Sequence, residues 1–248
     1  MIQTKRQMKH QKNKTKLEVY NISKSFGRVK ILNEVSFNLN NSEIVLLTGQ
    51  NGSGKSTLLK IIASLIHPDN GTIKIFGEKS PSKPEYTRTQ IGCLLHDNML
   101  YSDLTIRENL EFVAGLFGIE NIYKTVNDIG TTFELSRIMD TRIRYLSHGQ
   151  ARRAAIAKTF IHKPKLLLLD EPESGLDTIS LELLHKETNR LRSTGTTVLM
   201  TSHSFDTTNN ICDRVIILSN SKIICDKNLN EISSSEINDL ISKRSAGQ

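Results

Sequence analysis

The chain has 248 residues, of which 37% are hydrophobic and 24% charged, and its formal net charge is +7. This length allows one substantial core, and no apolar run approaches the roughly 20 residues that span a bilayer, so a role in transport would need another chain as the channel. Three cysteines without a CxxC pair argue against both a disulfide framework and a zinc site.

The basic balance belongs to the first 16 residues. They carry six Lys and Arg side chains and no acid, which leaves a net charge of +1 for the rest of the chain. We expect residues 1–16 to be a disordered, solvated tail, with weak attraction to an anionic membrane surface as the alternative. Because the remaining residues are nearly neutral, no nucleic-acid partner is expected.

Strands and helices are expected to alternate along residues 17–229. The alternating pattern of residues 35–40 predicts a half-buried strand, and the apolar residues 43–48 predict a buried one. A helix is expected from Lys55, with Leu65 on its apolar face and Pro68 beyond its end. Further strands are expected at residues 72–76, 165–170, 196–201, 214–219 and 222–225. This alternation indicates an α/β fold with a mostly parallel sheet.

A glycine-rich segment follows the second of these strands. It reads Gly49-Gln50-Asn51-Gly52-Ser53-Gly54-Lys55-Ser56, with Thr57 next, and has the pattern of a phosphate-binding loop between a strand and a helix. Glycines let backbone N–H groups turn toward phosphates, and a helix N-terminus adds a favourable dipole. Lys55 is predicted to contact the β- and γ-phosphates, and Ser56 to bind Mg²⁺ through its hydroxyl.

Two acids end a run of four leucines, Leu166–Leu169. The leucines are typical of a buried strand, but packing does not explain Asp170 and Glu171 directly after them. In parallel sheets, ligands bind beyond the carboxyl ends of the strands. Asp170 is therefore predicted to hold the Mg²⁺ shell, and Glu171 to accept a proton from the attacking water or to orient it.

The order of the short motifs resembles that of the ATPase subunit of an ABC transporter. Leu146-Ser147-His148-Gly149-Gln150 is similar to the LSGGQ signature of that family, with His148 at its first glycine. Ser147 is expected to cap a helix that starts at about Gln150, and a plain helix cap is the alternative interpretation. The resemblance implies that Ser147, Gly149 and Gln150 contact ATP held by a second subunit.

Further residues match the same family. Ser174–Asp177 resembles the D-loop, which implies that Asp177 lies at the dimer interface. His203, in Thr201-Ser202-His203, resembles the switch histidine beside the γ-phosphate and is predicted to be catalytic. Phe26 resembles the aromatic residue that stacks on adenine, although core packing would also explain a single aromatic side chain.

His96 departs from the family pattern, which usually has Gln at this place. The resemblance implies that His96 contacts Mg²⁺ and the attacking water, and imidazole can serve as a metal ligand. A histidine here resembles the haem-exporter branch that serves c-type cytochrome maturation, and Tyr101–Thr105 is compatible with that branch.

The resemblance covers about residues 17–225 and implies an α/β P-loop NTPase core with a mostly parallel sheet, N-terminal antiparallel strands and a small helical subdomain. We expect an ABC ATPase domain at 17–229, with the helical subdomain at about 97–160, and a polar C-terminal tail at 230–248. The implied activity is hydrolysis of ATP with Mg²⁺ by a dimer of cassettes, here a homodimer. It would energise a separate membrane-spanning subunit from the cytoplasmic face of the cell membrane.

Two alternatives to haem export stay open from the sequence. One is an ABC ATPase that energises another exporter. The other is a soluble ABC ATPase that acts on nucleic acid or ribosomes, a class that usually carries two cassettes or a long coiled-coil insertion, and this sequence shows neither.

Overall fold

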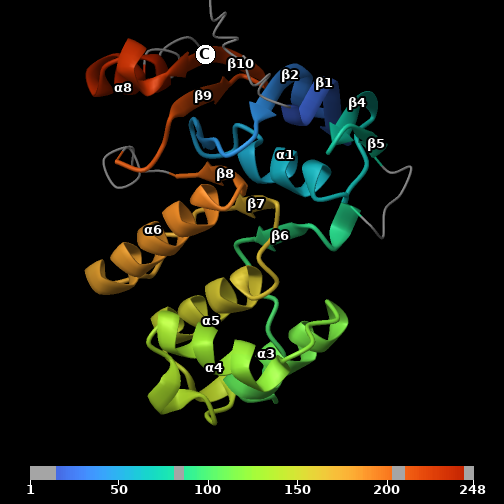
Figure 1. Cartoon of the computed structure of the whole chain (residues 1–248). Coiled ribbons are helices and arrows are strands. Elements are labelled where there is room, and N and C mark those ends of the chain that lie inside the picture. Colours follow the sequence, from blue (N-terminus) through green and yellow to red (C-terminus); the bar gives the residue numbers. More distant parts are fainter. Residues whose placement is uncertain (1–14, 81–86, 203–209, 243–248) are drawn as a thin grey trace, which may run out of the picture.

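Two β-sheets are stacked above a group of helices in the computed structural model of the chain, which describes residues 15–80, 87–202 and 210–242 (Figure 1). The smaller sheet is antiparallel, has the strand order β2-β1-β4-β5, and consists of β1 (Thr15–Phe26), β2 (Val29–Asn40), β4 (Asn70–Ile75) and β5 (Glu78–Ser80). In β2 the side chains of Val35, Phe37 and Leu39 are buried, as their alternation predicts.

The larger sheet has the strand order β10-β9-β3-β8-β7-β6 and is parallel except for β10. Its strands are β3 (Ile44–Thr48), β6 (Ile91–Leu94), β7 (Leu166–Leu169), β8 (Thr197–Thr201), β9 (Arg214–Ser219) and β10 (Lys222–Asn228). The expected α/β fold, with a mostly parallel sheet and antiparallel N-terminal strands, is confirmed.

Both faces of the parallel strands are covered, which explains why these strands are apolar without alternation. In β7, Leu166 and Leu168 pack in one core with the antiparallel sheet and α1 (Lys55–Ile62). Leu167 and Leu169 pack in a second core, formed with the helices on the other side. The run of four leucines therefore serves two cores at once.

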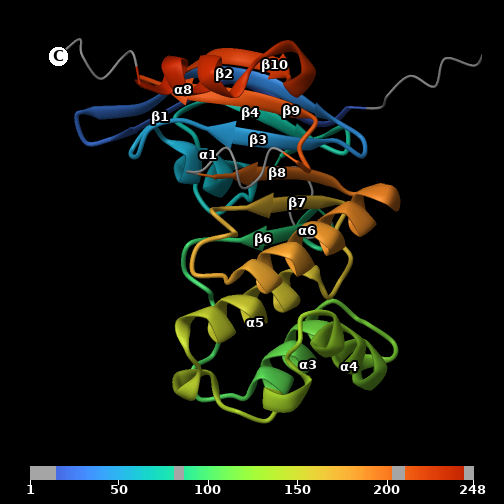
Figure 2. The ribbon, with the colours of Figure 1, turned by 90° about the vertical axis from the view of Figure 1, so that its left-hand side faces the viewer.

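Four helices of the middle part of the chain lie on that other side of the larger sheet (Figure 2). They are α3 (Ile106–Leu116), α4 (Ile122–Thr132), α5 (His148–Phe160) and α6 (Thr178–Ser193), with the short 3₁₀ turns η1 (Ser136–Ile138) and η2 (Ile143–Tyr145). Helix α5 lies next to the sheet, and α3 and α4 lie beyond it (Figures 1 and 2). Within the described ranges, none of the helices combines the length and the apolar character needed to traverse a bilayer.

Helix α1 is shorter than its apolar pattern predicts. It ends at Ile62, and Ser64 adopts a left-handed backbone with φ of 58°. The side chain of Leu65 is consequently 53% exposed rather than on the buried face. The prediction that Leu65 belongs to the helix is wrong, because the helix ends at Ile62 and the chain turns at Ser64, four residues before Pro68.

The polar tail expected at 230–248 is described as far as residue 242, and it contains most of η3 (Leu229–Glu231) and all of α8 (Ser234–Ser242). Ile237 of α8 is fully buried in the core on the helical side of the larger sheet. The Gln50 side chain also donates a hydrogen bond to the carbonyl of Ile241 over 2.7 Å. The C-terminal helix thus packs on the core and contacts the phosphate-binding loop.

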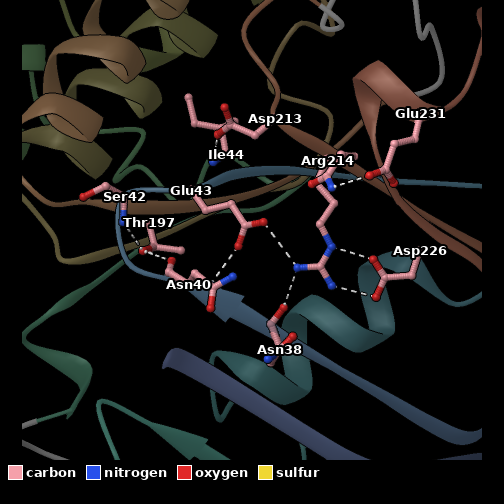
Figure 3. Close-up of polar contacts among 11 residues, drawn as sticks. Asn38, Asn40, Ser42, Glu43, Ile44, Thr197, Asp213, Arg214, Asp226 and Glu231 are labelled. Carbon is pink, nitrogen blue, oxygen red and sulfur yellow. Dashed lines mark hydrogen bonds and ion pairs between the residues drawn. The ribbon is translucent and has the colours of Figure 1, made fainter. Parts of the chain in front are cut away.

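A partly buried arginine ties the two sheets together at the amino ends of the parallel strands. Arg214 of β9 donates to both carboxylate oxygens of Asp226 at 2.5 and 2.6 Å, to the carbonyl of Asn38 at 3.0 Å and to Glu43 at 3.3 Å (Figure 3). Glu43 in turn accepts the backbone N–H of Asn40 at 2.8 Å. This network lies at the amino ends of the parallel strands, whereas the phosphate-binding loop follows the carboxyl end of β3. The two therefore lie at opposite ends of the strands.

Candidate nucleotide-binding site

The loop between β3 and α1 needs glycine at two positions. Gly49 has φ of 147°, and a Cβ atom there would lie 2.0 Å from the carbonyl oxygen of Leu218. Gly54 caps α1 with φ of 106°, and its Cβ would lie 2.9 Å from the carbonyl oxygen of Ile31. Any side chain would therefore collide with β9 or β2, or strain the backbone. The predicted phosphate-binding loop lies between strand and helix as expected.

Lys55 is the first residue of α1, and 5% of it is exposed. Its Nζ atom donates to the loop carbonyls of Gly49 at 2.8 Å and Gln50 at 3.0 Å. Burial lowers the pKa of Lys55, while the charges of Glu171 and Asp170 act in the opposite direction. The ammonium is thus held inside the loop, beside the two predicted acids.

A cleft of about 440 Å³ opens over this loop. It brings together four separate parts of the sequence: the loop and the start of α1, the hairpin of β1 and β2, the segment after β6, and the segment after β7. Its lining residues are Phe26, Ile31, Asn51, Gly52, Gly54, Lys55, Ser56, Thr57, His96 and Glu171. The structure therefore gathers most of the residues predicted to contact phosphate, adenine, water and metal at one cleft. Phe26 is 53% exposed there, and Nζ of Lys24 lies 5.5 Å from the centroid of its ring.

The two acids after β7 share one hydroxyl. Thr201 of β8 donates its hydroxyl hydrogen to Oδ1 of Asp170 over 2.8 Å. Oγ1 of Thr201 also accepts the backbone N–H of Glu171 at 2.9 Å. Asp170 is 2% exposed, whereas Glu171 lines the cleft. Glu171 also has a left-handed backbone, with φ of 47°, a conformation that is uncommon outside glycine. The surroundings hold Glu171 in this conformation.

The donor set near Lys55 fits Mg²⁺. The Ser56 hydroxyl and the Asp170 carboxylate supply the hard oxygen atoms that Mg²⁺ prefers. Within the described ranges, no group of three His, Cys, Asp or Glu side chains could hold a metal ion by itself. Mg²⁺ at nucleotide sites is usually held by one or two protein oxygens and by phosphates.

Ser147, Gly149 and Gln150 do not line the cleft. Helix α5 begins at His148 rather than at about Gln150, and Ser147 is its N-cap in a reciprocal capping box with Gln150. The backbone N–H of Gln150 donates to Oγ of Ser147 at 3.3 Å, and the backbone N–H of Ser147 donates to Oε1 of Gln150 at 3.0 Å. The first turn of α5 is thus fixed locally, without a contact to the cleft of its own chain.

The predicted D-loop lies beside the start of α5. A Cβ atom on Gly175 would lie 2.4 Å from Nδ1 of His148, so the imidazole packs directly against that glycine. Asp177 caps α6 by accepting the backbone N–H of Ser180 at 2.8 Å, and hydrogen bonds from Ser180 lower the pKa of Asp177. Asp177 does not line the cleft. His203 lies outside the described residues.

Two side chains of this region escaped the sequence analysis. The hydroxyl of Thr201 holds both acids, and its only signal was its place at the end of a predicted strand, directly before Ser202 and His203. Arg152 of α5 donates to the backbone carbonyls of Asp170 and Glu171. A helical arginine has no sequence signal for such a role, because its partners lie about 20 residues further along the chain.

A glycine loop that holds a buried lysine beside two strand-end acids defines a P-loop nucleotide-binding protein. The sequence model of the ABC transporter family matches residues 32–174. The chain therefore belongs to the ABC transporter family, as an ATP-binding subunit that hydrolyses ATP.

Two curated relatives illustrate the similarity. Nod factor export ATP-binding protein I of Burkholderia lata is 32% identical over 223 residues, which are 89% of this chain and 73% of that protein. ABC transporter ATP-binding protein NatA of Bacillus subtilis is 32% identical over 199 residues, which are 79% of this chain and 81% of that protein. The matches thus leave 27% of the first relative and 19% of the second uncovered.

Solved structures show the same fold. An ATP-binding subunit of an ABC transporter has a TM-score of 0.86 and 28% identity, and the match covers 92% of this chain and all of that one. A dimeric ATP-binding cassette in a post-hydrolysis state, bound to ADP and Pi, has a TM-score of 0.79 and 28% identity, with coverage of 86% and 98%.

Proposed function

We propose that two copies of this chain hydrolyse Mg²⁺-ATP at the cleft over residues 49–57 and thereby drive a separate membrane-spanning subunit. One observation carries the proposal: Lys55, Ser56, His96 and Glu171 line a single cleft, although they come from three distant segments. This set contains a cation for phosphate oxygens, a metal-binding hydroxyl and two groups that can act on water.

Each group has a distinct role in the proposal. Lys55 releases its loop carbonyls and binds the β- and γ-phosphate oxygens. Ser56 and Asp170 would hold Mg²⁺, which supplies positive charge against the charge that develops on the phosphates. Glu171 accepts a proton from the water whose oxygen bonds to the γ-phosphorus as the bond to the ADP oxygen breaks. His96 holds that water or the metal.

The position of α5 favours a site shared between two copies. Ser147 and Gln150 lie at the exposed start of α5, and neither lines the cleft of its own chain. A helix N-terminus presents free N–H groups and a positive dipole end, which suit a phosphate. We infer that Ser147, Gly149 and Gln150 contact ATP bound to the other copy, with Asp177 near the interface; the solved post-hydrolysis cassette is itself a dimer.

A membrane partner would dock beside His96 and the helices that follow it, which we propose form the helical subdomain. Large apolar side chains are exposed there: Tyr101, Phe112 and Leu116 at 56%, 45% and 68%. Tyr101 and Phe112 form an edge-to-face pair with ring centroids 5.3 Å apart. Exposed apolar clusters of this kind mark protein contacts. Such a partner would place the chain on the cytoplasmic face of the membrane.

The transported substrate belongs to the partner rather than to this chain. The relatives described above are named for Nod factor export and as NatA. Haem export, with its role in cytochrome c maturation, is predicted from His96 and stays a prediction.

Affinity purification from detergent-solubilised membranes tests the proposal. The full chain carries a tag, and bound proteins are identified after washing with and without ATP. We expect a polytopic membrane protein in stoichiometric amount, and addition of that protein in vesicles should stimulate ATPase activity. Recovery with ribosomes or nucleic acid, with none of the chain in the membrane fraction, would contradict the proposal. The control is Lys55→Ala, which should bind the partner but show no stimulated activity.

A further inference from the structure

Arg152 lies on α5, one turn and a half after the cap residue Ser147, and only 2% of it is exposed. No ion pair of Arg152 is found among the described residues. An arginine that is buried without a carboxylate partner loses hydration, and a leucine would fill such a place at lower cost. The two Nη groups of the guanidinium find acceptors elsewhere, whereas its Nε–H is buried without a partner.

The acceptors are backbone carbonyls beyond the carboxyl ends of two neighbouring strands, together with one side-chain amide oxygen. Nη1 donates to the carbonyl of Leu95 at 2.8 Å and to Oδ1 of Asn98 at 3.2 Å, beyond β6. Nη2 donates to the carbonyls of Asp170 at 3.0 Å and Glu171 at 2.8 Å, beyond β7. One planar guanidinium thus spans β6 and β7, which are adjacent in the sheet. Lysine could not make this two-armed contact.

Both strand ends lead directly into the cleft. His96 follows Leu95, and Glu171 is itself one of the residues whose carbonyl is bound. The main chain of Glu171 is held on both sides, by Thr201 at its N–H and by Arg152 at its carbonyl. Its left-handed φ of 47° would cost free energy in an unconstrained chain. Arg152 and Thr201 are two of the polar contacts on this main chain, and the backbone N–H of Ser174 also donates to the Glu171 carbonyl over 3.1 Å.

We propose that Arg152 is a positioning residue for ATP hydrolysis, which holds the backbone of Glu171 and of the His96 segment in the geometry that aims both side chains at the attacking water. The inference rests on the proposed function, because it requires Glu171 to act on that water. Since Arg152 does not line the cleft, its loss should reduce kcat while leaving the affinity for ATP nearly unchanged.

The test is a double-mutant cycle on the full chain. Arg152→Gln, Arg152→Lys and Glu171→Gln are measured singly, together with the double variant Arg152→Gln/Glu171→Gln. The readouts are kcat and KM for ATP, residual turnover in single-turnover assays with labelled ATP, and the Kd for ATP. We expect Arg152→Gln to lower kcat by about 10- to 100-fold, as for a misplacement on the order of 1 Å, with KM and Kd within about threefold. The kcat of Arg152→Lys should lie between that of Arg152→Gln and that of the parent.

In the Glu171→Gln background, Arg152→Gln should have little further effect, because both changes remove the same contribution. Arg214→Lys is the matched control, since it alters a partly buried, hydrogen-bonded arginine at the opposite, amino end of the parallel strands (Figure 3). It should lower stability and leave kcat near that of the parent. If Arg152→Gln does not fold, the cycle is run with Arg152→Lys. A kcat of Arg152→Lys equal to that of the parent would then overturn the proposal.

An equal loss of turnover from Arg152→Gln in both backgrounds would also overturn it, because the arginine would then not act through Glu171. A different outcome concerns Glu171→Gln alone: its turnover of ATP could equal that of the parent. It would show that Glu171 is not the base, and the proposed function itself would fail at that residue.

Discussion

Thr201 donates its hydroxyl hydrogen to Oδ1 of Asp170 over 2.8 Å and joins two neighbouring strands, β8 and β7, at the point where both reach the cleft. Oγ1 of Thr201 also accepts the backbone N–H of Glu171. Both acids therefore depend on one hydroxyl that is fully buried.

Thr201→Val removes that hydroxyl at nearly constant volume. The buried carboxylate of Asp170 and the N–H of Glu171 would lose a partner, so the free energy of unfolding should fall by about 1–3 kcal/mol and ATPase activity should fall with it. Urea unfolding and an ATPase assay measure the two effects. Thr201→Ser keeps the hydroxyl, so its free energy of unfolding and its ATPase activity should stay close to those of the parent. Equal stability and equal activity in the Val and Ser variants would contradict this role of the hydroxyl.

Lys55→Ala should abolish high-affinity nucleotide binding and leave the fold intact. Loss of charge-assisted hydrogen bonds to phosphate, worth about 3 kcal/mol, corresponds to an affinity loss of about 100-fold or more. A fluorescence titration with ATP measures it. Lys60→Ala, on the exposed side of the same helix, is the control and should bind as the parent does. Near-normal ATP affinity in Lys55→Ala would mean that the lysine does not bind phosphate.

Specific ATPase activity should depend on protein concentration. Ser147, Gly149 and Gln150 do not line the cleft of their own chain, so each complete site would need two copies. Activity per chain should drop on dilution, in step with a shift from dimer to monomer on sizing. Ser147→Ala should lower activity while ATP still binds to the monomer. Constant specific activity in a monomer would argue against a shared site.

His96→Ala should lower ATPase activity by about 10- to 100-fold, the range found when a group that orients a metal or its ligands is lost. His96 lines the cleft with Ser56 and Glu171, so the loss should appear in kcat. His96→Gln should retain activity, because an amide can also bind the metal or the water. If the Ala variant hydrolyses ATP as the parent does, with and without the membrane partner, His96 is a bystander.

Stability should fall in mild acid because of His162. Its imidazole stacks on Phe117 with ring centroids 3.8 Å apart, its Nε2 lies 3.2 Å from the carbonyl oxygen of Ile91, and its Nδ1 is buried without a partner. Burial lowers the pKa of His162 to about 4. The unfolded chain therefore binds more protons than the native one between about pH 6.5 and pH 4.

The resulting stability is fully present above pH 6.5 and is lost as the pH falls toward 4, by at most about 3 kcal/mol. Denaturant unfolding at pH 7.5, 6, 5 and 4 measures the slope. His162→Gln, which keeps a donor for Ile91 but does not titrate, should lose that part of the slope. An identical pH dependence in both proteins would show that His162 is not the group responsible.

The sequence by itself determined the parts of this protein that depend on contiguous residues. The phosphate-binding loop, the leucine strand with its two acids and the serine cap of α5 are short motifs, and their spacing reflects local backbone geometry. Because each motif occupies a known place on a strand or helix end, the α/β fold and the family followed from their order. The bounds of the ATPase domain and the role of His96 stay predictions.

Only the tertiary structure decided which distant residues meet at the strand ends. Arg152 and Thr201 reach Glu171 from α5 and β8, across gaps of about 20 and 30 residues in the chain, and Gln50 reaches Ile241 across almost 200. Such contacts arise from how helices and strands pack, and no local periodicity encodes them. The same holds for Leu65, whose exposure results from the left-handed turn at Ser64. Local sequence therefore specifies the chemical groups of the site, and packing specifies what holds them in place.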